Sequence, residues 1–176
     1  MNDLSQAEYG ALRDTIRERG TARMWAVLGG LAAWGALSAA LLITETGGAM
    51  PLVTLVVLAS TYEINFFIHT GVERIGRYIQ VFYEERDVRA GWETIAMKYG
   101  AKFPSGLDPL FSIVFAAAAL VNFLGSLPAA GRRPGWIVLS LAGHLAFAYR
   151  MVSTRSAARS QRTLDLERFR NLANEK

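Results

Sequence analysis

The stretch MWAVLGGLAAWGALSAALLI, residues 24–43, contains twenty residues without a charged side chain. A helix rises about 1.5 Å per residue, so this length crosses a hydrocarbon core of about 30 Å. Surface helices of a soluble domain keep a polar face, and residues 25–43 have no such face. The pattern therefore predicts a membrane-spanning helix. It disfavours the alternative, a soluble helical domain with buried core helices.

Three further apolar runs follow, at residues 51–72, 110–127 and 136–152. They are 22, 18 and 17 residues long, and a spanning helix needs about 17–25 residues. Charged residues make up 19% of the chain, below the soluble average of about 25%. The sequence thus predicts an all-α integral membrane protein, a four-helix bundle.

Basic residues are distributed unevenly among the segments that connect these runs. Seventeen lie in residues 1–23, in residues 73–109 and in the tail after Tyr149, whereas Arg132 and Arg133 are the two elsewhere. Cytoplasmic segments carry the excess of arginine and lysine. We therefore expect a multi-pass protein of the inner (plasma) membrane with both termini in the cytoplasm. The excess of arginine over lysine, 16 to 3, favours a GC-rich bacterial source.

The mostly polar start of the chain makes the first run a permanent anchor rather than a cleavable signal. Seven segments are expected in all. They are a cytoplasmic amphipathic helix (1–23), the first span (24–43), the second span (51–72), a cytoplasmic helical extension with a loop (73–109), the third span (110–127), the fourth span (136–152) and a cytoplasmic tail helix (153–176).

The second run is expected to continue as a helix beyond the membrane. Its apolar residues share an arc of about 60° that runs past Glu73: Val57, Ile64, Ile68, Ile75, Ile79 and Phe82. No proline interrupts residues 52–103. The pattern predicts one long helix from about Pro51 to the low nineties, followed by a turn at Gly100 and residues 104–106.

Two pairs of charged residues on this extension are spaced i,i+4 with the acid first, which is the favourable order on an exposed helix. They are Glu73 with Arg77 and Glu85 with Arg89. The sequence predicts cytoplasmic salt bridges at these positions.

Six polar residues in or beside the apolar runs are the candidate functional residues: Glu63, Asn65, His69, Glu73, Asn122 and His144. Ionisable groups inside a membrane are costly and are functional candidates by default. At helical rise, three of them lie at comparable depths of about 8–18 Å from the outer face. These are Glu63, Asn122 and His144, which we expect to interact within one chain.

Small residues on the first helix indicate close approach of a neighbouring helix. Gly29 with Ala33 and Gly35 with Ala39 are spaced i,i+4 on its surface. These pairs, like Ala116–Ala119 on the third run, permit close helix approach but are common in any membrane bundle, so they add little.

Three function classes are compatible with these features. The first is a structural or assembly component, either a homo-oligomer or an accessory subunit of a membrane complex, in which the polar residues hold helices together. The second is an ion or proton pathway along Glu63, His69 and Glu73. The third is a haem-binding membrane subunit. The two histidines differ in depth by about 15 Å, so one haem would have to be shared across subunits. The first class is the expected one.

Other classes find no support in the sequence. The chain has no HExxH, phosphate-binding loop, nucleophile elbow or zinc-ligand spacing, so no catalytic residue, metal site or cofactor is predicted. Basic residues in the tail favour contact with anionic lipid over nucleic acid. The expected partners are the lipid bilayer and either a second copy or another membrane protein.

Overall fold

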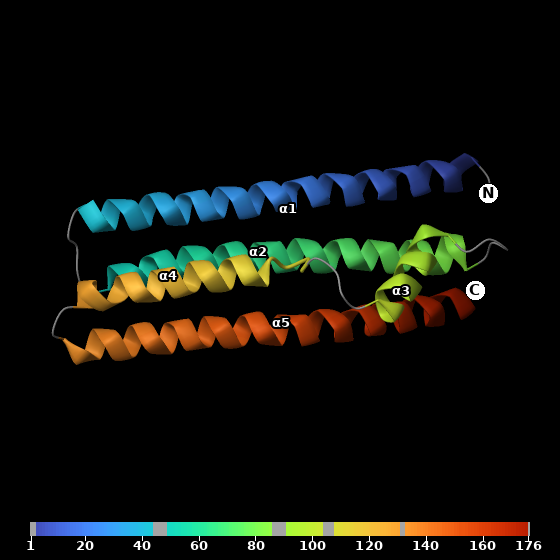
Figure 1. Ribbon diagram of the computed structural model, residues 1–176. Coiled ribbons are helices and arrows are strands. Elements are labelled where there is room, and N and C mark those ends of the chain that lie inside the picture. Colours follow the sequence, from blue (N-terminus) through green and yellow to red (C-terminus); the bar gives the residue numbers. More distant parts are fainter. Residues whose placement is uncertain (1–2, 44–48, 86–90, 104–107, 131–132, 176) are drawn as a thin grey trace. The chain divides into compact units, whose positions relative to one another are not determined.

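The computed structural model describes residues 3–43, 49–85, 91–103, 108–130 and 133–175. The elements are α1 (Asp3–Ile43), α2 (Met50–Ile79), η1 (Gln80–Glu84), α3 (Trp92–Lys102), α4 (Ser112–Ala130) and α5 (Pro134–Asn174). No strand occurs among the described residues, so the predicted all-helical class is confirmed (Figure 1).

Helices α1 and α5 are each 41 residues long. Each therefore continues without a break through the segment boundaries expected at residues 23 and 153. No proline lies near either boundary, and arginine, alanine, methionine and serine all tolerate a helical backbone. The amphipathic segments are thus direct extensions of the apolar ones.

The long helix expected from Pro51 to the low nineties ends earlier than predicted. It passes into the π-helical turn η1, where the N–H of Glu85 donates to the carbonyl of Gln80 at 2.8 Å. Residues 86–90 lie outside the described residues, and Gly91 has an extended backbone. Helix α3 is therefore a separate element, and the turn expected at residues 104–106 is also outside the described residues.

The carboxylate of Glu84 explains where α3 begins. It accepts hydrogen bonds from the backbone N–H groups of Glu93 and Thr94 at 2.9 and 2.8 Å. These are donors that the first turn of a helix leaves unsatisfied. A Cβ atom on Gly91 would lie 2.3 Å from the Glu84 side chain, so only glycine fits beside this carboxylate.

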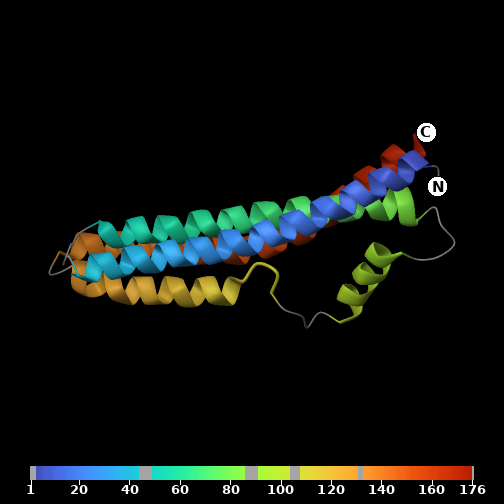
Figure 2. The same ribbon diagram turned by 90° about the horizontal axis from the view of Figure 1, so that it is seen from above.

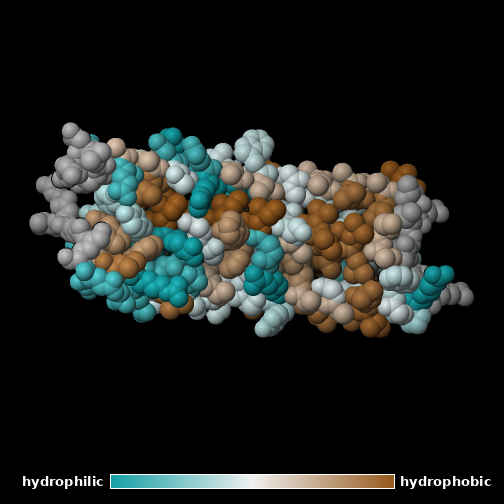
Figure 3. Space-filling view, turned by 180° about the vertical axis from the view of Figure 1, so that it is seen from behind, coloured by the Kyte–Doolittle hydropathy of each residue, from teal (hydrophilic) through white to brown (hydrophobic). Residues whose placement is uncertain are grey.

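The chain divides into two compact units. Unit 1 comprises residues 1–22, 67–109 and 156–176, and unit 2 comprises residues 23–66 and 110–155. Unit 2 holds only seven of the 34 charged residues (19 basic and 15 acidic): Arg23, Glu45, Glu63, Arg132, Arg133, Arg150 and Arg155. Hydrophobic side chains accordingly gather over unit 2 and hydrophilic ones over unit 1 (Figure 3).

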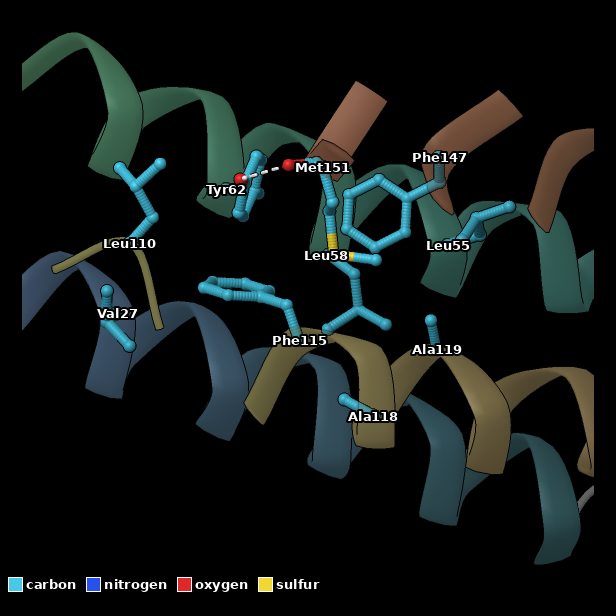
Figure 4. Packing of buried hydrophobic residues seen from close by; sticks show 10 residues of the cluster. All are labelled: Val27, Leu55, Leu58, Tyr62, Leu110, Phe115, Ala118, Ala119, Phe147 and Met151. Atoms are coloured by element: carbon cyan, nitrogen blue, oxygen red, sulfur yellow. Dashed lines mark hydrogen bonds between the residues drawn. The ribbon is translucent and has the colours of Figure 1, made fainter. Parts of the chain in front are cut away.

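In unit 2, four helical segments lie side by side, with α1 and α4 running opposite to α2 and α5 (Figures 1 and 2). Its core is built from side chains of all four (Figure 4): Val27, Leu55, Leu58, Tyr62, Leu110, Phe115, Ala118, Ala119, Phe147 and Met151. The Tyr62 ring packs edge-on against Phe115 and Phe147, with centroids 5.2 and 5.8 Å apart.

The buried face of α2 is more polar than its apolar stripe suggested. Within unit 2 this face presents Thr54, Leu58, Tyr62 and Asn65, each less than 2% exposed. In contrast, Ile64 of the expected stripe is 49% exposed. Large apolar side chains thus cover the outside of unit 2, and polar ones lie within it.

Among the described residues, three helices are long and apolar enough to cross a membrane, namely α1, α2 with η1, and α5. The apolar part of α4 is shorter but carries no charged residue.

Helices α1 and α2 approach each other at Gly30, one residue from the expected contact. A Cβ on Gly30 would lie 2.1 Å from Thr61 Oγ1, whereas a Cβ on Gly29 or Gly35 would meet nothing within 4 Å. Sequence spacing alone does not show which of Gly29, Gly30 and Gly35 lies at the helix contact, because all three are on the apolar part of α1.

Gly30→Ala should destabilise the protein by about 1–3 kcal/mol, because the added methyl group overpacks the contact with Thr61. Gly29→Ala is the matched control, and it should leave stability unchanged or raise it slightly through helix propensity. Unfolding of the detergent-solubilised protein in denaturant measures both. Equal stability of the two variants would contradict this packing.

Candidate functional site

Asn122, on α4, is the centre of a hydrogen-bond network that joins all four helical segments of unit 2. Its Oδ1 accepts hydrogen bonds from Trp34 Nε1 at 3.1 Å and from Thr54 Oγ1 at 2.5 Å. Its Nδ2 donates to the carbonyl of Pro51 at 3.0 Å and lies 3.1 Å from His144 Nε2. An amide side chain offers two donors and two acceptor positions, so Asn122 uses its full capacity.

The hydrogen bonds of His144 determine its tautomer. Its Nδ1 lies 2.7 Å from the carbonyl oxygen of Ser140, which can only accept, so Nδ1 carries the proton. Nε2 is then free to accept the hydrogen bond from Asn122. The arrangement requires a neutral imidazole with both nitrogens occupied. No nitrogen of His144 is left to bind a metal or a haem iron.

Further polar contacts extend this network along the same helices. Ser126 and Ser140 hydroxyls lie 2.8 Å apart between α4 and α5. Nearer the other end of unit 2, the hydroxyls of Tyr62 and Thr154 lie 2.6 Å apart and join α2 to α5. Both pairs are buried, and each satisfies polar atoms that would otherwise be costly to remove from water.

Asn65 fixes the point at which the chain enters α4. Its side chain is fully buried, and its Nδ2 donates to the carbonyl of Leu110 at 2.8 Å. The next residue, Phe111, has a φ of 55°, a left-handed conformation that costs roughly 1–2 kcal/mol for a residue with a side chain. The Asn65 bond therefore supports a strained turn. The Oδ1 atom of Asn65 is buried and has no hydrogen-bond partner.

Glu63 does not join the Asn122 network, contrary to expectation. It forms a bidentate ion pair with Arg150 of α5, with N–O distances of 2.6 and 2.8 Å. The Arg150 guanidinium also lies 5.3 Å from the centroid of the Phe66 ring. The side chains of Glu63 and Arg150 are 43% and 44% exposed. Unit 2 thus presents a charged but neutralised pair on its surface.

The extension of α2 in unit 1 also pairs with α5. Arg162 Nε lies 2.7 Å from a Glu73 oxygen, although neither atom makes a well-directed hydrogen bond. Glu85 accepts two hydrogen bonds from Arg170 at 2.6 and 3.2 Å. Arg89, its expected partner, lies outside the described residues. The described charges therefore join α2 to α5.

Arg77 takes Glu93 of α3 as its ion-pair partner, at 3.2 Å. The same carboxylate binds Arg13 of α1 at 2.7 Å. Arg77 is 3% exposed and also donates to Gln80 within its own helical extension. A buried cation that is paired and hydrogen-bonded in this way holds its neighbours firmly, because a missing partner would leave a charge uncompensated. This cluster attaches α3 to α1 and α2.

Burial and pairing shift the pKa values of several groups in unit 1. Burial lowers the pKa of Arg77, against the opposing effect of Glu73 and Glu93. The hydrogen bond from Arg170 lowers the pKa of Glu85. Burial, together with a hydrogen bond to Glu8, raises the pKa of Tyr83 to about 12. Each of these groups has a defined partner in the packed unit.

A cavity of about 320 Å³ lies beside the Asn122 network. Residues from α1, α2 and α4 line it: Trp34, Gly35, Ser38, Ala39, Leu41, Leu42, Pro51, Thr54, Val121, Asn122 and Gly125. It is about twice the size of an engineered cavity that admits benzene. The buried hydroxyl of Ser38 has no hydrogen-bond partner.

Comparisons with known proteins add no identification. No family model, curated protein or solved structure matches the chain. The arrangement of the polar residues is therefore the basis for any functional proposal.

The structure brings together only part of the expected set. Asn122 and His144 meet directly, as predicted. His69 is buried in unit 1, at 6% exposure. No sequence pattern distinguishes Trp34, Thr54 or Arg150, which complete these contacts. These three residues lie in or beside apolar runs. The depth of each residue along its helix was the one sequence signal that could indicate which polar groups meet.

Asn122→Leu should destabilise the protein by about 1–3 kcal/mol, because it leaves buried donors and acceptors of four partners unsatisfied. Asn171→Leu, at an exposed position of α5, is the matched control and should have little effect. Denaturant unfolding of the purified protein compares them. A stability loss no larger for Asn122→Leu than for the control would show that the network contributes nothing.

The raised pKa of Tyr83 predicts a late step in an alkaline titration. The ordinary tyrosine pKa is about 10, so the folded state binds this proton more tightly than the unfolded state. The resulting stability is fully present below pH 10 and is lost as pH rises through about 12. Absorbance at 295 nm follows the titration, and Tyr83→Phe should remove its step near pH 12. If the variant instead loses a step near pH 10, the environment assigned to Tyr83 is wrong.

Proposed function

We propose that unit 2 lies in a bilayer as a four-helix bundle and that unit 1 lies in the cytoplasm. Three helices have the length and composition of membrane spans, and α4, with 19 residues, reaches about 28 Å at helical rise. The exposed apolar side chains of unit 2 suit contact with lipid. Most charged residues fall in unit 1, where water solvates them.

The distribution of basic residues supports the orientation. Fourteen of the 19 lie in unit 1, which is assigned to the cytoplasm, and this excess marks the cytoplasmic side. We assign the protein to a bacterial inner membrane with both termini inside.

Within this membrane the chain acts as a structural component that assembles with a second copy of itself. The polar groups of unit 2 support a structural role. Asn122 and His144 use their hydrogen-bonding capacity within the bundle. Interhelical hydrogen bonds of this kind are worth roughly 0.6–2 kcal/mol each in membranes.

The exposed ion pair of Glu63 and Arg150 is the observation that carries the assembly proposal. Asn65, two residues after Glu63, bonds to Leu110, which lies two residues before α4 begins, so the pair lies level with the first turn of a proposed span. Charges facing lipid at such depth are costly. The Glu63–Arg150 pair has no net charge, so it attracts lipid headgroups only weakly. The same pair on a second copy of the chain would, however, be complementary to it. Across a two-fold axis, Arg150 of one copy would face Glu63 of the other.

The alternative functions find less support in the geometry. Both acids of the expected ion pathway are held by arginines of α5, Glu63 by Arg150 and Glu73 by Arg162. Haem ligation by His144 would require breaking a hydrogen bond to one of its nitrogens. An accessory subunit of a larger complex differs from self-assembly only in its partner, and a native mass distinguishes the two.

Replacing both partners, Glu63→Gln with Arg150→Gln, should weaken self-association about ten- to a hundredfold, because interfacial charge pairs contribute roughly 1.5–3 kcal/mol. Fluorescence energy transfer between labelled copies in lipid nanodiscs or mixed micelles measures the dissociation constant. Loss of the pair should barely alter the stability of one copy, since exposed ion pairs contribute about 0–1 kcal/mol.

The pair Glu85 and Arg170 provides the matched control, because it is also bidentate and exposed but lies in unit 1. Its double glutamine variant should associate like the native chain. A native mass corresponding to a single copy in the extracted protein would overturn self-assembly. A mass that includes a different protein would establish the accessory-subunit alternative.

A further inference from the structure

Helix α3 presents an apolar face that unit 1 leaves uncovered. The exposed fractions are 70% for Trp92, 53% for Ile95, 64% for Tyr99 and 48% for Phe103, the residue that follows the helix. At 100° per residue these positions fall within about 80° of one another. Two aromatic rings of this face, Tyr99 and Phe103, stack 5.0 Å apart. The face is therefore a continuous stripe.

The opposite face of α3 is anchored, so the helix cannot turn the stripe inward. Glu93 binds Arg13 and Arg77, and Thr94 donates both its N–H and its hydroxyl to Glu84. Rotating α3 about its axis would break these buried contacts. The exposure of the stripe is thus built into unit 1.

Exposed apolar residues in unit 2 are explained by the bilayer core, but α3 belongs to unit 1 and needs a different partner. Lys98 and Lys102, both exposed, flank the stripe on one side of the helix. Tryptophan and tyrosine favour the membrane–water interface, and lysine beside them suits anionic headgroups. The composition is that of a helix lying in the plane of a membrane surface.

The chain also keeps α3 within reach of the bilayer. Six residues lie between Phe103 and Leu110, where unit 2 resumes, so seven Cα–Cα steps connect them. Even when fully extended they span at most about 25 Å. In the proposed placement, this connection is short enough for α3 to reach the cytoplasmic surface of the bilayer.

We propose that α3 is an interfacial anchor that inserts Trp92, Ile95 and Tyr99 into the cytoplasmic leaflet of a membrane containing anionic phospholipid. This inference rests on the membrane placement proposed for unit 2. The lysines would contact lipid phosphates, while the stripe reaches the upper part of the acyl chains. The anchor would hold unit 1 against the membrane through the Glu84 and Glu93 contacts.

Nitroxide labels on single cysteines test this placement in the full-length chain, which has no native cysteine. Ile95→Cys reports on the stripe, Arg168→Cys on an exposed position of unit 1 and Leu145→Cys on an exposed position of unit 2. Each variant is placed in nanodiscs of phosphatidylcholine with or without phosphatidylglycerol. Collisions with oxygen indicate lipid, and collisions with a water-soluble nickel complex indicate solvent.

The label at Ile95 should be oxygen-accessible and shielded from nickel in discs containing phosphatidylglycerol, and should lose this signature when Lys98 and Lys102 are changed to Glu. A nickel-accessible label there, like that at Arg168, would overturn the anchor. A label shielded from both reagents would also overturn it, by showing that protein covers the stripe. The label at Leu145 reports separately on unit 2, so nickel accessibility there would contradict the membrane proposal itself.

Discussion

The four hydrogen bonds of Asn122 are the constraint on which unit 2 depends. They connect α1, α2, α4 and α5 through one side chain, and they leave it no unused donor or acceptor. A buried amide that is fully paired favours one arrangement of its neighbours, because every alternative exposes an unsatisfied group to an apolar environment. The hydrophobic core around Tyr62 packs between the same helical segments. Polar bonding and apolar packing therefore stabilise the same set of helix contacts.

The two units differ in where their polar and charged groups lie. Unit 2 buries polar side chains such as Asn65, Asn122 and His144 and exposes large apolar ones, and Glu63 and Arg150 form an ion pair on its surface. Unit 1 joins its helices with charges, such as Glu85 with Arg170 and Glu93 with Arg13 and Arg77. A helix that passes through both units, such as α2, changes its bonding partners along its length. The membrane placement proposed for unit 2 gives a physical reason for this change.

Much of the helical organisation could be predicted from the sequence, because apolar runs and helix breakers act locally. The all-helical class and the meeting of Asn122 with His144 followed from run length and depth. The end of α2 could not be predicted from local sequence. Near this end, the Glu84 carboxylate accepts hydrogen bonds from the first turn of α3, and Gly91 leaves the space that this contact needs. The partners of Glu63 and Glu73 were also missed. Helical i,i+4 spacing points to local pairs, whereas the arginines that bind them lie on α5, distant in sequence.

The central claim is that the polar side chains of unit 2 are hydrogen-bonded to one another and hold its helical segments together. The tautomer of His144 tests this claim most directly, and the chain has only one other histidine, which a His69→Gln variant removes from the spectrum. Nitrogen-15 NMR of that variant in lipid at pH 7.5 should show a neutral His144 ring with its proton on Nδ1 and a hydrogen bond accepted at Nε2. Asn122→Leu should remove the effect of that hydrogen bond on the Nε2 shift. A proton on Nε2, or a spectrum insensitive to Asn122, would contradict the account.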